Sequence, residues 1–314
     1  MKSTAIMEPR HFVIKADAVL GEGPLWCPAT QSLIWIDGNR PQYFRWRWGA
    51  DQAESWPLER PPAALAQLPD GGLLMAFRAR MGLLAFPGAA ITEIDMPGLA
   101  LGDERFNDAK VDAQGRLWIG TIDRALHRPI GHFRRMDASG IHAMAGGFAL
   151  SNGMAWSPDG CTLYFSESFD RLVHRFDFDP ATGGIAHAGI LTSFHGAPKP
   201  DGLTVDAEGG IWCAVFGGGC INRYLPDGTL DRSLKVPVTN PTSCMFGGPD
   251  MKTLFVTTAS YGLDDAAKAA QPLAGSVFAF SMDVAGLPEP VLDQRCVLLR
   301  NAPAPEVPRG LCHV

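Results

Sequence analysis

Short runs of apolar residues recur along the chain, each centred on a bulky side chain and separated from the next by polar turns. The central residues of six such runs are 39, 44, 46, 48 and 43 residues apart. These residues are Trp35, Leu74, Trp118, Tyr164, Trp212 and Phe255. Four short strands with their turns need about 40 to 50 residues, the length of one propeller blade. The spacing therefore predicts an all-β protein, a six-bladed β-propeller with four-stranded blades.

Turn sequences precede most of these runs and support the same division into blades. Pro-Asp-Gly stands at 69–71 and 158–160, and Asp-Ala-Gln-Gly at 112–115. Proline presets φ and glycine tolerates φ > 0, so such sequences reverse the chain readily. A strand is expected at 171–178, where polar and apolar residues alternate. A helical pattern of one or two turns is visible only at 264–270.

The ring needs a closing strand in its last blade, because an open ring would expose a sheet edge. We expect residues 12–16 to supply the outer strand of that blade, beside a strand at 275–280. The whole chain, residues 1–314, is then expected to form one domain. Its propeller core should span about 12–285, followed by a C-terminal tail at 286–314.

Composition and charge narrow the range of partners. Of the residues, 46% are hydrophobic, and 35 glycines and 25 prolines are scattered as many tight turns require. The formal charge of -6 excludes the broad cationic field of a nucleic-acid-binding protein. No apolar run is long enough for a signal peptide or a membrane span. We expect a cytoplasmic protein, a monomer or weak homo-oligomer, with a small-molecule partner and no contact with nucleic acid or membrane.

Four oxygen-bearing side chains recur at almost the same distance before the central residues of their blades. Glu22, Asn107, Asn152 and Asp201 precede them by 13, 11, 12 and 11 residues. The innermost strand of each blade lines the channel of a propeller, so these side chains should meet at one mouth of that channel. Carboxylate and amide oxygens suit a hard divalent cation, and Ca, Mg, Mn, Zn and Fe(II) all remain open.

Other catalytic patterns are absent from the sequence. It contains neither an HExxH zinc motif nor a GxSxG nucleophile elbow. Asp108 follows Asn107 directly, and since neighbouring residues of a strand point to opposite faces, we expect Asp108 to play a structural part.

Motifs in five segments, taken in their order, resemble those of the senescence-marker-protein/gluconolactonase family, also called regucalcin-like. They are Gly21-Glu22-Gly23-Pro24-Leu25-Trp26, Arg105-Phe106-Asn107-Asp108, Gly115-Arg116-Leu117-Trp118-Ile119-Gly120-Thr121, Ser151-Asn152-Gly153 and Pro200-Asp201-Gly202. The resemblance covers roughly residues 15–285 and looks closest to bacterial sugar lactonases.

The resemblance implies a six-bladed propeller with one divalent metal ion held by Glu22, Asn152 and Asp201. It also implies that Arg105 and Asn107 contact the substrate. Animal members of the family use a further acidic residue where an ungapped count places Ala125 here. We therefore take Asp123, two residues earlier, as a further candidate for substrate binding.

Together these expectations describe a hydrolase that opens an aldonolactone, of the glucono-, xylono- or arabinono-lactone type, to the sugar acid. Asp201 is expected to act both as metal ligand and as general base for the attacking water. Two alternatives stay open: a non-catalytic calcium-binding or regulatory propeller, and a propeller esterase or organophosphate hydrolase.

Overall fold

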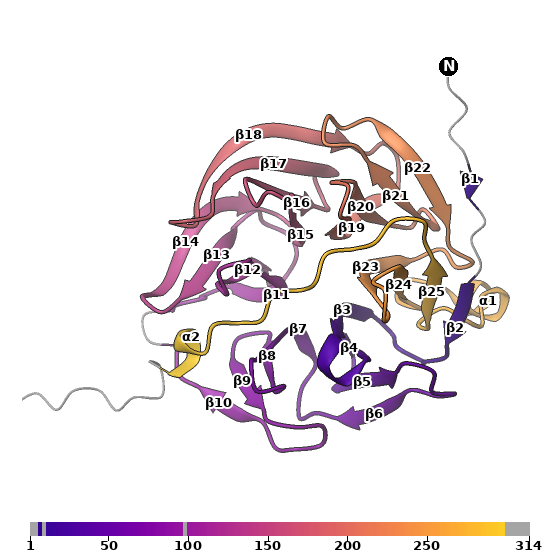
Figure 1. Cartoon of the computed structure of the whole chain (residues 1–314), viewed down its shortest axis with the longest axis horizontal. Coiled ribbons are helices and arrows are strands. Elements are labelled where there is room, and N and C mark those ends of the chain that lie inside the picture. Colours follow the sequence, from indigo (N-terminus) through magenta and orange to yellow (C-terminus); the bar gives the residue numbers. More distant parts are fainter. Residues whose placement is uncertain (1–5, 8–10, 97–98, 299–314) are drawn as a thin grey trace, which may run out of the picture.

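The computed structural model describes residues 6–7, 11–96 and 99–298, which form a ring of six β-sheets around a central channel (Figure 1). The first strand of each sheet contacts the first strands of both neighbouring sheets, so these six strands line the channel. Later strands pair side by side outward, and within the described residues every sheet has four antiparallel strands. The predicted six-bladed propeller is confirmed.

Blades 1 to 3 follow one another along the chain. Blade 1 consists of β3 (Gly21–Cys27), β4 (Ser32–Asp37), β5 (Gln42–Arg47) and β6 (Glu54–Pro57). Blade 2 consists of β7 (Pro62–Gln67), β8 (Leu73–Phe77), β9 (Met81–Leu84) and β10 (Thr92–Ile94). Blade 3 consists of β11 (Glu104–Val111), β12 (Leu117–Asp123), β13 (Gly131–Asp137) and β14 (Gly140–Phe148).

Blades 4 to 6 continue the ring. Blade 4 consists of β15 (Ser151–Trp156), β16 (Thr162–Glu167), β17 (Leu172–Asp179) and β18 (Gly184–Ser193). Blade 5 consists of β19 (Lys199–Val205), β20 (Ile211–Phe216), β21 (Cys220–Tyr224) and β22 (Leu230–Lys235). Blade 6 contains β23 (Pro241–Gly247), β24 (Thr253–Thr258) and β25 (Val277–Ser281). A short strand, β1 (Ile6–Met7), adds to blade 5 parallel to β22.

The N-terminal strand β2 (His11–Ile14) completes the last blade. It pairs antiparallel with β25, and Phe12 lies opposite Ala279. The prediction of an N-terminal closing strand is therefore confirmed, although the strand ends two residues earlier than expected. Backbone hydrogen bonds between the two ends of the chain thus close the ring.

The six bulky residues that revealed the repeat are core residues. Each lies on the second strand of its blade and is at most 2% exposed. Neighbouring blades pack through such side chains: the ring of Trp26 in blade 1 stacks on Phe255 of blade 6 at 5.7 Å between centroids. The apolar pattern of the sequence is therefore the packing pattern of the ring.

The helices of the described residues are short. They are η1 (Pro28–Thr30), α1 (Asp265–Ala270) and α2 (Arg295–Leu298). The predicted helix at 264–270 is confirmed as α1, and the Asp264 carboxylate caps it by accepting a hydrogen bond from the Ala267 amide at 2.8 Å. Over the ranges given above, no helix is long and apolar enough to cross a membrane.

An Asp-Ala-x-Gly turn in two of the blades also ties the core together. Asp206, which follows β19 and is fully buried, accepts hydrogen bonds from the Gly210 amide, from Trp212 Nε1 at 2.7 Å and from Arg223 Nε at 2.7 Å. Asp112 is bound in the same way in blade 3. These buried charges are fully paired, as buried charges normally are.

Each innermost strand carries a β-bulge near its first end. In β11, Phe106 lies opposite Thr121 and Ala109 lies opposite Ile119, so two residues of β11 share one partner position. The other five innermost strands have the same irregularity at the corresponding place. A bulge bends the strand and re-aims its side chains, and bulges often border functional sites.

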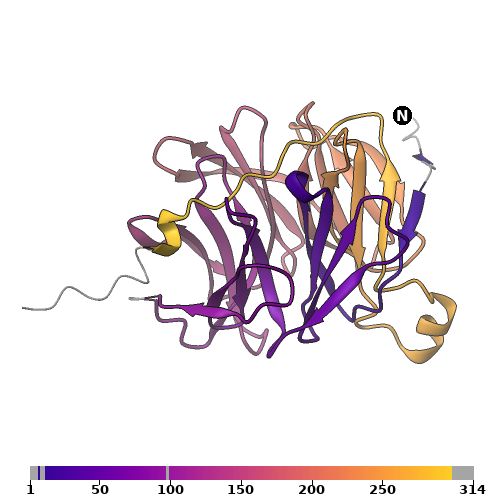
Figure 2. The same cartoon turned by 60° about the horizontal axis from the view of Figure 1, so that its bottom comes forward.

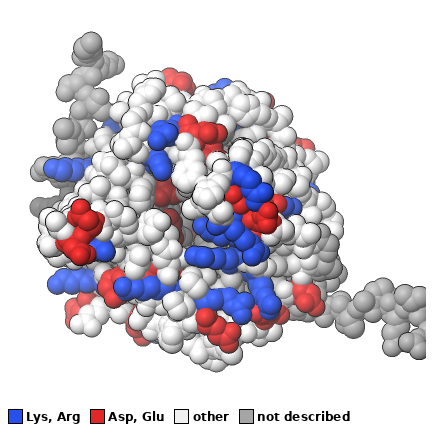
Figure 3. Space-filling model, turned by 180° about the vertical axis from the view of Figure 1, so that it is seen from behind, with Lys and Arg blue, Asp and Glu red and all other residues white. Residues whose placement is uncertain are grey.

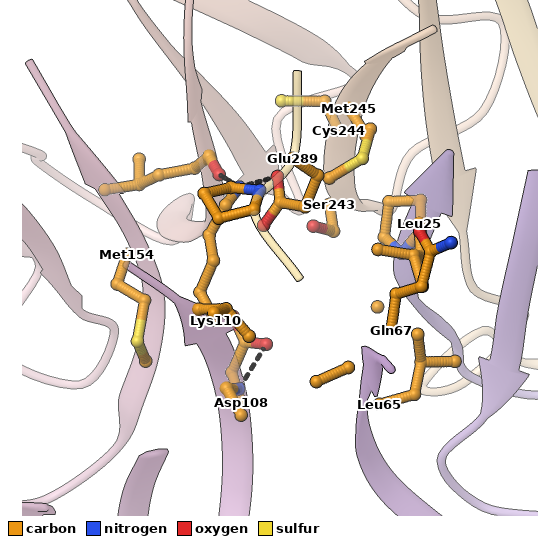
Figure 4. A pocket seen from close by; sticks show the side chains of 17 residues that line it. Leu25, Leu65, Gln67, Asp108, Lys110, Met154, Ser243, Cys244, Met245 and Glu289 are labelled. Atoms are coloured by element: carbon orange, nitrogen blue, oxygen red, sulfur yellow. Dashed lines mark hydrogen bonds and ion pairs between the residues drawn. The ribbon is translucent and has the colours of Figure 1, made fainter. Parts of the chain in front are cut away.

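The segment after β25 crosses the other end of the channel, where the innermost strands end (Figures 1 and 2). The Leu292 amide donates to the Gln67 carbonyl at 2.8 Å. Nearby, the Glu289 carboxylate and the Lys110 ammonium point toward each other, 3.5 Å apart (Figure 4). Residues 286–298 of the predicted tail therefore cover this end, and the rest of the tail lies outside the described residues.

Candidate active site

A pocket of about 350 Å³ opens at the end of the channel where the innermost strands begin. Five of the six side chains that the sequence analysis selected line it: Glu22 from β3, Arg105 and Asn107 from β11, Asn152 from β15 and Asp201 from β19. A pocket of this size suits a small ligand. The structure thus brings together residues that are far apart in the chain, while their chemical roles stay predictions.

Glycines allow the innermost strands to approach one another at this mouth. A Cβ on Gly153, which follows Asn152, would collide with the backbone of β19 at Asp201. A Cβ on Gly202, which follows Asp201, would collide with Ser243 of β23. A side chain at either position would force the strands apart. Glycine is therefore needed here for close contact between blades as well as for ligand space.

Hydrogen bonds between amide groups fix one side of the pocket. The Asn107 Nδ2 group donates to Asn152 Oδ1 at 3.0 Å and to the Ser151 carbonyl at 2.8 Å. Asn152 Nδ2 in turn donates to Ser168 Oγ at 2.9 Å. Arg105 Nη1 lies 3.5 Å from Asn107 Oδ1. Asn152 is therefore held at both ends of its amide, and its oxygen keeps one lone pair for a ligand.

The carboxylates on the other side have fewer partners: Glu22 Oε2 accepts the Gly23 amide at 3.1 Å. Asp201 is 6% exposed, and within the described residues its buried Oδ1 accepts no hydrogen bond. Burial and the negative charge of Glu22 raise the pKa of Asp201 well above its usual value. Burial and the charge of Asp108 raise the pKa of Glu22 to about 8. Unpaired carboxylates this close are costly, and a cation between them would remove the cost.

These donors fit the predicted divalent ion. The set consists of the carboxylates of Glu22 and Asp201 and the amide oxygen of Asn152, the hard oxygen ligands that such ions prefer. Nowhere in the described ranges do three His, Cys, Asp or Glu side chains group closely enough to hold a metal ion. A cation here would depend on the Asn152 amide, with further positions left for water or substrate.

Asp108 corrects an expectation from the sequence. Strand alternation placed it on the far side from Asn107, yet it also lines the pocket. The bulge in β11 is the reason, since residues 107 and 108 together occupy one position of the ladder. Burial raises the pKa of Asp108 to about 6, and its Oδ1 accepts the Ala109 amide at 2.8 Å. Its charge is the second cause of the raised pKa of Glu22.

Asp123 lies away from the pocket, and the structure does not bring it to the predicted substrate site. Its buried carboxylate accepts the amides of His127 and Arg128 at 3.1 and 3.0 Å and pairs with the Arg128 guanidinium at 3.2 Å. These bonds hold the pKa of Asp123 far below its usual value. Asp123 therefore shapes the loop after β12, and Leu126 of that loop lines the pocket instead.

Several further side chains that the sequence analysis did not select line the pocket, among them two cations and a tyrosine. These three are Arg78, Lys199 and Tyr261. Lys199 lies two residues before Asp201 on β19, so strand periodicity could have placed it on the same side. Arg78 and Tyr261 follow β8 and β24, and no motif marks them. On this face, Lys and Arg side chains gather around a hollow with acidic side chains inside it (Figure 3).

Comparison with known proteins finds a family model, relatives and a solved structure that are similar to this chain. The SMP-30/gluconolactonase/LRE-like family model matches residues 20–260. Regucalcin of Gallus gallus is 31% identical over 290 residues, 86% of this chain and 93% of that protein. The 6-deoxy-6-sulfogluconolactonase of Pseudomonas putida is 32% identical over 289 residues, 90% of this chain and 98% of that protein. The solved structure of a calcium-binding protein, regucalcin, from Agrobacterium tumefaciens matches with a TM-score of 0.81 at 29% identity, covering 88% and 95% of the two chains.

Proposed function

Since this chain belongs to the SMP-30/gluconolactonase/LRE-like family, we propose that it is a metal-dependent hydrolase that opens an aldonolactone to the sugar acid. The name of the Pseudomonas putida relative supports a sugar lactone as substrate. The description of the Agrobacterium tumefaciens protein as calcium-binding supports a divalent cation. The substrate is taken to be of the glucono-, xylono- or arabinono-lactone type.

One observation carries the proposal. The buried Oδ1 atom of Asp201 has no hydrogen-bond partner within the described residues, and it lines the same pocket as Glu22, Asn152, Arg105 and Asn107. A buried carboxylate oxygen without a partner is rare in proteins and indicates an ion or a reacting group. Oxygen ligands for a cation and hydrogen-bonding groups for substrate hydroxyls thus lie in one pocket.

Glu22, Asn152 and Asp201 would hold one divalent ion, and Ca, Mg, Mn, Zn and Fe(II) all accept such ligands. When bound, this ion would supply a Lewis acid that polarises the lactone carbonyl and makes a water more acidic.

Asp201 accepts the proton of the attacking water in the proposed reaction. As the water oxygen bonds to the carbonyl carbon and the ring C–O bond breaks, the proton passes from Asp201 to the departing ring oxygen. The products are a carboxylic acid and a free hydroxyl group, so atoms and charge balance. Arg105 and Asn107 orient the substrate from the strand beside Asn152: Arg105 presents N–H donors to the pocket. Asn107, whose two N–H groups bond to Ser151 and Asn152, presents its amide oxygen as an acceptor.

A non-catalytic calcium-binding propeller is the second candidate, and relatives named regucalcin are the observation that favours it. It needs the carboxylates and Asn152 but gives no part to Arg105. The propeller esterase or organophosphate hydrolase has less support, because charged side chains line the mouth where a lipophilic substrate would enter.

A lactone panel tests the proposal. Protein stripped of metal by a chelator is reloaded with each ion in turn, and acid release from glucono-, xylono- and arabinono-lactone is followed in a pH-stat. We expect release that stops with chelator and returns with at least one ion. Calcium binding by calorimetry without release from any lactone would favour the non-catalytic alternative. Release that chelator does not change would contradict the role of the metal.

A further inference from the structure

Charges in the pocket are arranged in two layers. Lys199 lies two residues before Asp201 on β19, and Arg105 lies two residues before Asn107 on β11. Both strands begin at the open end, so each cation should lie roughly 7 Å nearer the mouth than the group that follows it. Arg78 comes directly after β8, which ends at the same mouth. Below, we call Arg78, Arg105 and Lys199 the cationic rim.

The side chains of the cationic rim are paired differently from their neighbour Arg80. In the part of the chain that the structure describes, Arg78, Arg105 and Lys199 make no ion pair, and Lys199 Nζ instead lies 4.7 Å from the centre of the Phe169 ring. Arg80, two residues after Arg78, shows the contrast: it pairs with Glu93 at 2.6 Å. Several other described cations also form no ion pair, so the rim is distinguished by position: its three cations line one pocket.

Two guanidinium groups of the rim repel each other. Burial and the positive charge of Arg78 lower the pKa of Arg105 to about 10. Like charges brought together cost free energy unless a ligand of opposite charge lies between them. Figure 3 shows Lys and Arg side chains gathered around the hollow, and such cations favour a phosphate, sulfonate or carboxylate group as ligand.

The total charge of the pocket also favours an anionic ligand. Its carboxylates, those of Glu22, Asp108 and Asp201, formally balance the three cations of the rim. A divalent ion would therefore leave the pocket positive. Each hydroxyl group of a neutral lactone can both donate and accept a hydrogen bond, so it binds best where acceptors and donors are present. The Arg and Lys side chains of the rim can only donate hydrogen bonds.

We infer that the pocket selects lactones whose end remote from the carbonyl carries an anionic group, such as a terminal phosphate, sulfonate or carboxylate. This inference rests on the proposed function, because it takes the carbonyl to lie at the carboxylate and amide floor. The remote end of the substrate then reaches the cationic rim, where Arg78 and Arg105 bind its oxygens.

The test compares two lactones that differ only at the remote end: glucono-δ-lactone and the same lactone phosphorylated on its terminal hydroxyl. The ratio of their kcat/KM values is measured for the native protein and for Arg78→Met, Arg78→Lys and Lys199→Met. We expect the native protein to favour the phosphorylated lactone by about tenfold or more, since charge-assisted bonds are the strong ones. Arg78→Met should remove most of this preference, and Arg78→Lys should keep part of it.

Arg80→Met is the matched control, because Arg80 belongs to the same segment but pairs with Glu93. Its ratio should equal that of the native protein, and the native preference should weaken as salt is added. Equal turnover of both lactones, or a ratio that no rim substitution changes, would overturn the inference and leave the lactonase intact. Turnover of neither lactone with any ion would overturn the proposed function, and this inference with it. A lactone with a terminal carboxylate then shows whether the rim distinguishes phosphate from carboxylate.

Discussion

Two buried aspartates near the two ends of β19 differ in almost every contact. Asp206, at the covered end of the channel, accepts bonds from two backbone amides, a Trp indole and the Arg223 guanidinium. Asp201, at the open end, has a buried oxygen with no partner in the described part of the chain. Both belong to one blade and both are at most 6% exposed. A buried carboxylate that the chain itself satisfies is structural, whereas one left unsatisfied marks a place for a ligand.

The same difference separates the two ends of the channel as a whole. At the covered end, Lys110 meets Glu289 of the C-terminal segment. At the open end, carboxylates face carboxylates and Arg78 faces Arg105. The covered end therefore contributes stability, and the open end gives up stability, as the proposed binding of an ion and a substrate requires.

The largest effect is expected from Asp201→Asn. It neutralises a proposed metal ligand and removes the proposed base, so kcat/KM for a hydrolysed lactone should fall about a thousandfold or more. The melting temperature without metal should stay the same or rise, because the change removes a charge that no partner offsets. Acid release and circular dichroism on the same preparation check both. A variant that melts much earlier would show that Asp201 is needed for the fold.

Asp206→Asn should reverse this pattern. Its amide cannot accept all the hydrogen bonds of the carboxylate and leaves Arg223, which is 4% exposed, without its main buried partner. We expect a loss of about 3 kcal/mol in the free energy of unfolding. Activity per folded molecule should be unchanged. Urea unfolding measures the free energy of unfolding, and active-site titration measures the activity per folded molecule. If Asp201→Asn and Asp206→Asn were equally stable, the two aspartates would not differ in their structural role.

The sequence predicts the blades and the grouping of the site residues, but not the contacts that distinguish Asp206 from Asp201. The repeat of bulky residues gave the blades, because the same apolar position is buried in each one. The shared register of Glu22, Asn152 and Asp201 placed them at one mouth. Asp206, by contrast, was part of a turn in the sequence, and nothing there shows that its carboxylate binds Trp212 and Arg223.

The errors have physical reasons as well. Asp108 was expected to face away, but a bulge breaks the two-residue period, and a bulge has no clear sequence signal. Asp123 was expected at the substrate, but Arg128, five residues later, binds its carboxylate. A residue count cannot tell whether a loop folds back on its own side chain.

Glu22→Gln sharpens the comparison through stability alone. In chelator at pH 8 this variant should melt about 2 °C above the native protein, because one of several crowded carboxylates becomes neutral. At pH 4, below the ordinary glutamate pKa of 4.5, the two should melt together. A carboxyl whose pKa folding raises to about 8 stays protonated in the folded protein while the unfolded chain ionises, so native stability falls as the pH rises from about 4.5 to about 8. Saturating calcium should reverse the order at pH 8. Glu59→Gln, on the exposed surface, is the control and should show none of these shifts.

The smallest effect is expected at the covered end, from Glu289→Gln. The carboxylate of Glu289 and the ammonium of Lys110 are 12% and 15% exposed, so the pair is largely shielded from water, and a neutral amide weakens it. Backbone bonds such as that from Leu292 to Gln67 still hold the segment in place. We therefore expect a loss of only about 1 kcal/mol in the free energy of unfolding. The pair lines a cavity at the covered end together with Asp108, which also lines the pocket, so kcat/KM and metal affinity should stay close to native values. A drop in either without a change in folding would mean that the two ends are coupled through the channel, and the separation of stability from binding would then be wrong.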